Sequence, residues 1–121
     1  MVETHGLSHI SLAVQDPQRS LEFYALVFGV REYYRDEDQI QVQGPGPFDV
    51  LAFERKPNHA GNQGGIDHFG FRLKKPGDIA LAVAEVQRAG GRLLRQGEFA
   101  PGLPFAYVAD PDGYEIEIWF E

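Results

Sequence analysis

Three residues carry side chains that could together hold a metal ion: His9, His68 and Glu117. Two neutral imidazoles and one carboxylate form a ligand set that suits Fe(II), Mn(II), Zn(II), Ni(II) or Co(II), and it leaves coordination positions open for water or substrate. An ion bound in this way can polarise a substrate oxygen or stabilise a developing negative charge. Because no local motif joins the three residues, the inference depends on the elements that position them.

An internal repeat relates the two histidines. The segment 6–14, GLSHISLAV, and the segment 65–73, GIDHFGFRL, each read Gly, an aliphatic residue, a variable residue, His and then an alternating stretch. The histidines lie 59 residues apart, close to half of the 121-residue chain. A lone strand histidine is ordinarily structural or merely exposed, but two at the same place in a repeat favour a shared function.

Helix signals follow each copy of the repeat. Asp16 is a predicted N-cap, Pro17 suits the first helical position and Gly29 can end the helix. Asp78 and Gly90 are predicted to play the same parts in the second half. The predicted apolar stripes are Leu21, Tyr24, Ala25 and Phe28 in the first helix and Ile79, Ala82, Val83 and Val86 in the second.

Three strand-like segments follow each helix, separated by clusters of Gly and Pro. They are predicted at residues 31–35, 39–43, 49–55, 92–96, 105–109 and 114–120. Each half therefore reads strand, helix, strand, strand, strand. We predict a single α+β domain over residues 1–121, with βαβββ modules at 5–56 and 66–121 joined by a polar, glycine-rich linker at 57–65.

Period-two alternation sorts each strand into an apolar face and a face of polar and aromatic residues. Ile10, Leu12 and Val14 point away from His9 and Ser11. Two further strands are predicted to be divided in the same way, with Phe69 and Phe71 opposed to His68, and Ile116 and Ile118 opposed to Glu115, Glu117 and Trp119. Phe105 and Tyr107 are predicted to share one face of their strand. His, Ser, Tyr and Trp suit a lined cavity better than a solvated sheet surface.

The composition of the chain excludes several kinds of partner and of functional site. The formal net charge of −7 disfavours nucleic acid as a partner, because such proteins carry a basic face. The absence of cysteine excludes disulfides, thiolate metal ligands and a cysteine nucleophile. No apolar run approaches the roughly 20 residues that span a bilayer, and no signal peptide is evident. We therefore expect a cytoplasmic protein with no membrane partner.

Three motifs, LSHISLAVQDPQRSLEFY, IDHFGFRL and ADPDGYEIEIWF, resemble the vicinal-oxygen-chelate superfamily. This superfamily includes glyoxalase I, fosfomycin-inactivating thiol transferases, extradiol dioxygenases, methylmalonyl-CoA epimerase and bleomycin-resistance proteins. The resemblance spans about residues 5–120. It implies two βαβββ modules that form a cupped, incomplete eight-stranded barrel around a metal site, with His9, His68 and Glu117 as ligands. It also implies a homodimer, and chelation of substrate oxygens as the shared chemistry.

One departure separates the chain from glyoxalase I, which adds a fourth ligand, a Glu on the last strand of the first module. By pseudo-symmetry with Glu117, that position should be Leu51 or Ala52 here, and neither can bind metal. Glu54 would need a register shift, which moves a whole strand pattern. The resemblance therefore implies a three-ligand site and argues against authentic glyoxalase I.

Resemblance to the fosfomycin-inactivating enzymes implies substrate contacts. Ser11 falls where those proteins use a Thr, Tyr107 on a substrate-binding Tyr, and Arg95 near a Lys. Phe105 and Trp119 are expected to form apolar walls. The candidate proton acceptors are Glu115 and Glu54.

Two functions from different classes fit these observations. The first is a divalent-metal-dependent enzyme of lyase, thiol transferase or dioxygenase type that acts on a small molecule, with a thiol as co-substrate in the transferase case. The second is a metal-free protein that binds a small drug, as bleomycin-resistance proteins do. The presence of the metal triad favours the first.

Overall fold

The computed structural model describes residues 1, 3, 5 and 7–121, and Gly6, the first residue of the predicted repeat, lies outside this set. The chain divides into two compact units, Met1–Ala60 and Gly61–Glu121. The division falls inside the segment predicted as a linker, part of which forms a short 3-10 helix, Pro57–His59.

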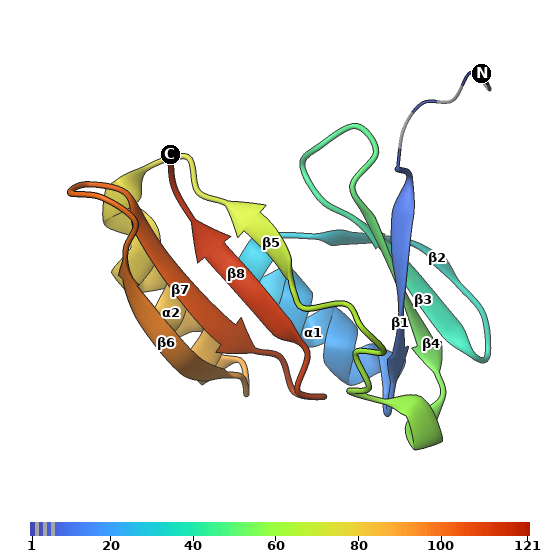
Figure 1. Ribbon diagram of the computed structural model, residues 1–121. Coiled ribbons are helices and arrows are strands. Elements are labelled where there is room, and N and C mark those ends of the chain that lie inside the picture. Colours follow the sequence, from blue (N-terminus) through green and yellow to red (C-terminus); the bar gives the residue numbers. More distant parts are fainter. Residues whose placement is uncertain (2, 4, 6) are drawn as a thin grey trace. The chain divides into compact units, whose positions relative to one another are not determined.

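Unit 1 runs strand, helix, strand, strand, strand (Figure 1). Its strands form one mixed sheet in the order β1-β4-β3-β2, with β1 parallel to β4 and the other neighbours antiparallel. The bounds are β1 His9–Val14, α1 Pro17–Phe28, β2 Arg31–Arg35, β3 Gln39–Gln43 and β4 Val50–Arg55. The βαβββ module predicted for the first half is confirmed.

Unit 2 repeats this topology, with the sheet order β5-β8-β7-β6 and β5 parallel to β8. The bounds are β5 Phe69–Arg72, a 3-10 helix Pro76–Asp78, α2 Ile79–Arg88, β6 Arg92–Glu98, β7 Pro104–Ala109 and β8 Glu115–Trp119. The predicted α+β class is therefore correct for both units. His68 was expected inside a strand, but it lies directly before β5, where the ladder with β8 begins.

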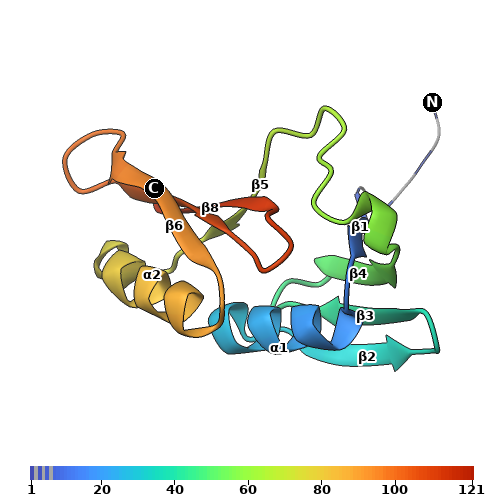
Figure 2. The same cartoon turned by 90° about the horizontal axis from the view of Figure 1, so that it is seen from below.

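Each helix covers the apolar face of its own sheet. In unit 1, α1 packs against β3 and β4, and in unit 2, α2 packs against β6, β7 and β8 (Figure 2). Side chains buried under α1 include Leu12, Val14, Val42 and Phe53, and those under α2 include Val86, Ala106, Val108, Ile116 and Ile118. Because strand side chains alternate, these apolar residues leave His9, Ser11, Tyr107 and Glu117 on the opposite faces of their sheets.

Helix ends follow the predicted signals in α1 but not at the start of α2. Asp16 is extended and its side chain accepts from the Gln18 amide, while Gly29 ends α1 with a φ of 67°. Asp78 makes no side-chain capping bond. It is the last residue of a 3-10 turn with φ −82° and ψ −2°, whereas a capping side chain needs an extended backbone. No helix of the described chain is long and apolar enough to cross a membrane.

Candidate metal centre

Two of the three predicted ligands meet in unit 2. His68 Nε2 lies 3.3 Å from Glu117 Oε2, and their side chains are 30% and 15% exposed. The approach follows from the β5–β8 register, which pairs Phe69 with Ile116 and Gly70 with Glu117. Gly70 keeps this approach open, because an added Cβ there would lie 3.1 Å from the main-chain oxygen of Glu117.

Neighbouring groups orient both of these side chains. His68 Nδ1 is 2.5 Å from Asp67 Oδ2, so this carboxylate holds the nitrogen that faces away from Glu117. The Tyr107 hydroxyl donates to Glu117 Oε1 at 3.0 Å, and the Tyr107 ring meets the His68 ring edge to face. One imidazole nitrogen and one carboxylate oxygen are thereby left facing each other. A carboxylate on the second imidazole nitrogen is the usual partner of a metal-binding histidine, since it fixes the tautomer and the ring orientation.

The pair fits a shared divalent ion. Two ligands that each lie roughly 2.1 Å from one ion are separated by about 3.0 to 3.4 Å at octahedral or tetrahedral angles. The observed separation of 3.3 Å between His68 Nε2 and Glu117 Oε2 falls in that range. Nitrogen and carboxylate oxygen are also the donors that borderline divalent ions accept.

The same carboxylates act on the protonation of His68 when no metal is bound. The hydrogen bond with Asp67 raises the pKa of His68 above 6.5, burial opposes this, and Glu117 raises it further. Burial together with the bond to Glu117 raises the pKa of Tyr107, so its hydroxyl keeps its proton at neutral pH. Because the folded-state pKa of His68 is raised, its stabilising contribution is complete below the unfolded value and is lost as pH rises through the folded value.

Replacing Asp67 by Asn should therefore lower the pKa of His68 in the metal-free protein. The Asn side chain can still bond to Nδ1 but carries no charge to favour the imidazolium. An NMR titration of the His68 ring protons measures the shift, with Asp49→Asn as a charge-matched control elsewhere in the chain. An unchanged His68 titration in Asp67→Asn would show that this carboxylate does not govern the ring.

The third predicted ligand, His9, belongs to unit 1 and shows a parallel arrangement. Ser8 Oγ lies 2.9 Å from His9 Nδ1, so the side chain that precedes each repeat histidine occupies the same ring nitrogen. His9 borders a cavity of about 170 Å³ together with Ser8, Tyr33, Gln41, Val50 and Ala52. The Tyr33 hydroxyl donates to Gln41 Oε1 at 2.6 Å across this cavity wall.

Strand register identifies the unit 1 position equivalent to Glu117. Ile10 pairs with Leu51 as Phe69 pairs with Ile116, so Ala52 takes the place of Glu117. On the neighbouring strand, Gln41 faces Ala52 as Tyr107 faces Glu117. Of the two positions considered from sequence, Ala52 is therefore the equivalent one, and Glu54 lies two residues further along the same face.

Both candidate proton acceptors are engaged with other side chains. The Ser11 hydroxyl donates to Glu54 Oε2, and Lys56 Nζ lies 3.9 Å from the same oxygen. Glu115 Oε1 lies 2.8 Å from Arg95 Nη2, and the Arg95 guanidinium sits 3.9 Å from the centre of the Tyr107 ring. Glu54 is thus linked to a hydroxyl that can relay a proton, whereas Glu115 is held in an ion pair.

The two predicted apolar walls lie on the same face of unit 2 as Glu117. Phe105 pairs with Trp119 across β7 and β8, and its ring stacks on Phe99 at 4.6 Å between centroids. Its ring also meets Tyr107 edge to face at 5.7 Å. Gly97 leaves room for the Phe105 ring, since an added Cβ there would lie 3.1 Å from it.

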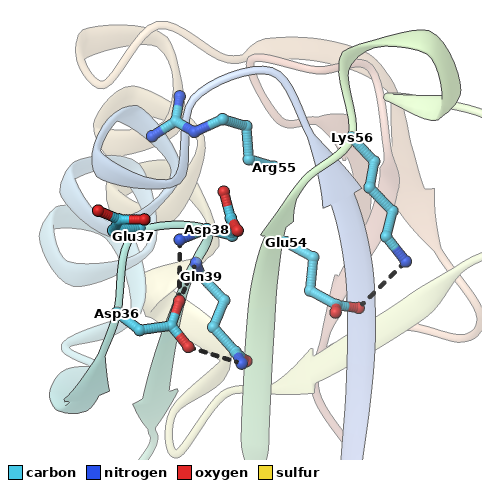
Figure 3. Close-up of a pocket in the computed structure, with 7 residues that line it drawn as sticks. All are labelled: Asp36, Glu37, Asp38, Gln39, Glu54, Arg55 and Lys56. Carbon is cyan, nitrogen blue, oxygen red and sulfur yellow. Dashed lines mark hydrogen bonds and ion pairs between the residues drawn. The ribbon is translucent and has the colours of Figure 1, made fainter.

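A second hollow in unit 1, of about 610 Å³, lies where the β2–β3 turn meets the end of β4 (Figure 3). Its wall is rich in acidic side chains, but Asp36 is turned onto its own loop. Asp36 accepts from the amides of Asp38 and Gln39 and from the Gln39 side chain. Glu54 and Lys56, which form an ion pair, border the same hollow. The Asp36 carboxylate thus serves to close the turn.

The sequence did not single out Asp67 and Ser8, the partners of the two histidines. Each fills the variable position of the repeat, directly before its histidine, and that shared polarity was the available signal. Among the described residues, no group of three or more His, Asp or Glu side chains is gathered closely enough to hold a metal ion. The structure brings His68 and Glu117 together within unit 2, whereas His9 belongs to unit 1.

Two curated relatives align with nearly the whole chain. The manganese-dependent 2,3-dihydroxybiphenyl 1,2-dioxygenase of Geobacillus genomosp. 3 is 24% identical over 98% of this chain, which spans only 38% of that protein. The lactoylglutathione lyase of Escherichia coli O157:H7 is 30% identical over 93% of this chain and 90% of its own length. The chain thus spans little more than a third of the dioxygenase and nearly all of the lyase.

Solved structures agree on the fold. A glyoxalase-related enzyme from Fulvimarina pelagi is 28% identical, with a TM-score of 0.80 over 98% of this chain and 89% of that one. The fosfomycin resistance protein FosX from Listeria monocytogenes is 18% identical, with a TM-score of 0.83 over 98% and 95% of the two chains, and shows the fold alone. The family model of the Glyoxalase/Bleomycin resistance protein/Dioxygenase superfamily matches residues 6–118. With this match over most of its length, the chain belongs to that superfamily.

Proposed function

We propose that the protein is a divalent-metal-dependent enzyme that acts on a small oxygen-chelating molecule. His68 and Glu117 supply two ligands, and His9 supplies the third, from the same chain or from a second copy in a homodimer. The observation that carries the proposal is the facing pair of His68 Nε2 and Glu117 Oε2, 3.3 Å apart, with the second donor atom of each already held by Asp67 or Tyr107. The ion is Fe, Mn, Zn, Ni or Co, because these accept such donors.

The bound ion would supply Lewis acidity toward a substrate oxygen. The protein residues then have separate tasks. Asp67 and Tyr107 keep His68 and Glu117 in the geometry that the ion needs, which removes the cost of ordering them on binding. Trp119 and Phe105 provide apolar walls that exclude water from the face of unit 2. The carboxylate of Glu54, bonded to the Ser11 hydroxyl, accepts a proton from the substrate.

The reaction belongs to the lyase, thiol transferase or dioxygenase types rather than to authentic glyoxalase I. This part of the proposal is supported by Ala52, which stands at the position equivalent to Glu117 and offers no ligand. A three-ligand site keeps more positions open for substrate oxygens than a four-ligand site does. The lactoylglutathione lyase activity named for one relative is therefore not expected of this chain.

The proposal is tested by elemental analysis of protein purified without chelator or affinity tag, followed by turnover assays on the metal-loaded protein. About one metal ion per chain is expected, with activity on a catechol or on a thiol plus epoxide pair. Turnover of the hemithioacetal substrate of glyoxalase I would contradict the three-ligand assignment. Substoichiometric metal that cannot be raised by dialysis against Mn(II), Fe(II), Zn(II), Ni(II) or Co(II) would refute it. Metal-free protein that binds bleomycin tightly would instead support the drug-binding alternative.

A further inference from the structure

One cation on the ligand-bearing face of unit 2 has no carboxylate side chain as a partner. Arg72 ends β5, and its guanidinium lies 5.6 Å from the centre of the Trp119 ring. It also donates to the main-chain oxygen of Glu121. Within the described part of the chain, no Asp or Glu side chain pairs with Arg72. Most of its fork of N–H donors is therefore available to an incoming anion.

The other arginine on this face is in a different state. Arg95 lies over the Tyr107 ring and is paired with Glu115 at 2.8 Å. A guanidinium already paired with a carboxylate attracts a second anion less, because much of its charge is compensated. In the residues that the structure describes, Arg72 has no such side-chain partner, and its bond to the main-chain oxygen of Glu121 leaves its other N–H donors to receive an anionic group of a substrate.

The strand register sets the spacing between Arg72 and the candidate metal ligands. Gly70 pairs with Glu117, and Arg72 pairs with Trp119 two residues further along. Two residues of a strand span roughly 7 Å. The space over Gly70 is filled by its neighbours, since a Cβ at this position would lie 3.1 Å from the main-chain oxygen of Glu117 and 3.5 Å from Trp119 Nε1. A flat molecule that reached from one end to the other would therefore lie on the Trp119 indole rather than on the backbone of β5.

The surroundings of Arg72 also favour a planar anion. Trp119 and, across the β7–β8 pairing, Phe105 give an aromatic surface beside it. Arg72, Lys74 and Lys75 concentrate three of the chain's eleven basic residues in four positions, although the net charge is −7. This end of β5 is a local basic segment in an acidic chain, which raises the local concentration of anions.

We propose that Arg72 binds a carboxylate of the substrate. The substrate class that follows is a small planar carboxylate whose paired oxygens, roughly 7 Å from the carboxylate, bind the metal held by His68 and Glu117. A guanidinium matches a carboxylate through two parallel hydrogen bonds, which gives orientation as well as affinity. The binding of the paired oxygens to a metal ion rests on the proposed function, whereas the contact between Arg72 and the substrate carboxylate does not.

A matched pair of probes tests this assignment: 3,4-dihydroxyphenylacetate, which carries the carboxylate, and 4-ethylcatechol, which lacks it. Titration calorimetry on metal-loaded protein gives the two dissociation constants, and fluorescence of Trp119, the one tryptophan of the chain, reports binding beside Arg72. Arg72→Gln should raise the Kd of 3,4-dihydroxyphenylacetate roughly 10- to 100-fold and that of 4-ethylcatechol less than about threefold. Arg72→Lys should recover part of the loss, because it keeps the charge without the fork.

Arg88→Gln is the control, since Arg88 lies on α2 and pairs with Glu85 at 2.7 Å. It should leave both dissociation constants unchanged. Equal weakening of the two probes by Arg72→Gln, or no weakening of either, would overturn the assignment and would indicate that Arg72 only packs on Trp119.

Two measurements distinguish failure of the metal proposal from failure of the Arg72 site. The metal content is measured first, and a second pair of probes is then tested on metal-free protein. Phenylacetate should shift the Trp119 indole N–H resonance at lower concentration than 2-phenylethanol does, and Arg72→Gln should abolish this difference. If metal does not load but this difference is seen, the proposed function fails and the Arg72 site stands. If phenylacetate binds no better than 2-phenylethanol in the wild type, the Arg72 site is refuted whatever the metal content.

Discussion

Replacing Glu117 by Gln or His68 by Ala is expected to weaken metal binding by at least about 100-fold, since loss of supporting groups around a metal already costs about 10- to 100-fold. Glu117→Gln is the sharper change. The amide keeps the size of the side chain and can still accept from Tyr107, but it removes the charged donor. The bound metal is measured by elemental analysis after dialysis, and circular dichroism and thermal unfolding check that the fold is retained.

Matched controls accompany these variants. Glu115→Gln changes a carboxylate on the same strand that is paired with Arg95, and His59→Ala removes a histidine of the segment between the two sheets. Both proteins should keep about one metal ion per chain, as the proposal requires of the wild type. His9→Ala tests the third ligand and should lose metal as His68→Ala does. Equal metal content in all five variants would refute the metal centre.

Ala52→Glu is expected to convert the site to a four-ligand type. Ala52 holds the register position equivalent to Glu117 and borders the same cavity as His9. An added carboxylate there should tighten metal binding on the order of tenfold or more, because metal affinity rises with the number of charged ligands. It should also reduce turnover of the native substrate, since one open position is lost.

Competition with a chelator measures the affinity change in Ala52→Glu, and the same assay on Ala52→Gln separates the charge of the new side chain from its bulk. Ala52→Gln should show no gain in affinity. If both variants retain metal equally well, or both lose it, the pseudo-symmetry between position 52 and Glu117 does not extend to metal ligation.

Much of each unit could be predicted from local patterns. The strands of residues 31–35 and 39–43 were predicted with their observed bounds, and Asp16 and Gly29 mark the ends of α1 as expected. Such signals depend on the sequence within one turn or one strand, so they survive without tertiary information. Asp78 is the exception, because the preceding 3-10 turn placed it in a helical conformation that prevents capping.

The candidate site was predictable only in part. Alternation correctly put Glu117 and Trp119 on one face of their strand, but alternation cannot say which residues of the neighbouring strand share that face or which atoms touch. The bonds of Asp67 to His68 and of Tyr107 to Glu117 depend on rotamers and on the register between strands. Arg72 was missed for the same reason, since its contact with Trp119 follows from the pairing of β5 with β8.

The contrast between Ala52 with Gln41 and Glu117 with Tyr107 bears on how a duplicated unit can evolve. Only one of the two copies carries the carboxylate proposed to bind metal and the hydroxyl that holds it. The other copy is released from that requirement, so its equivalent face can accumulate substitutions at Gln41, Ala52 and Tyr33 without loss of Glu117. New substrate preferences can then arise in one half of the gene while the chemistry is conserved by the other.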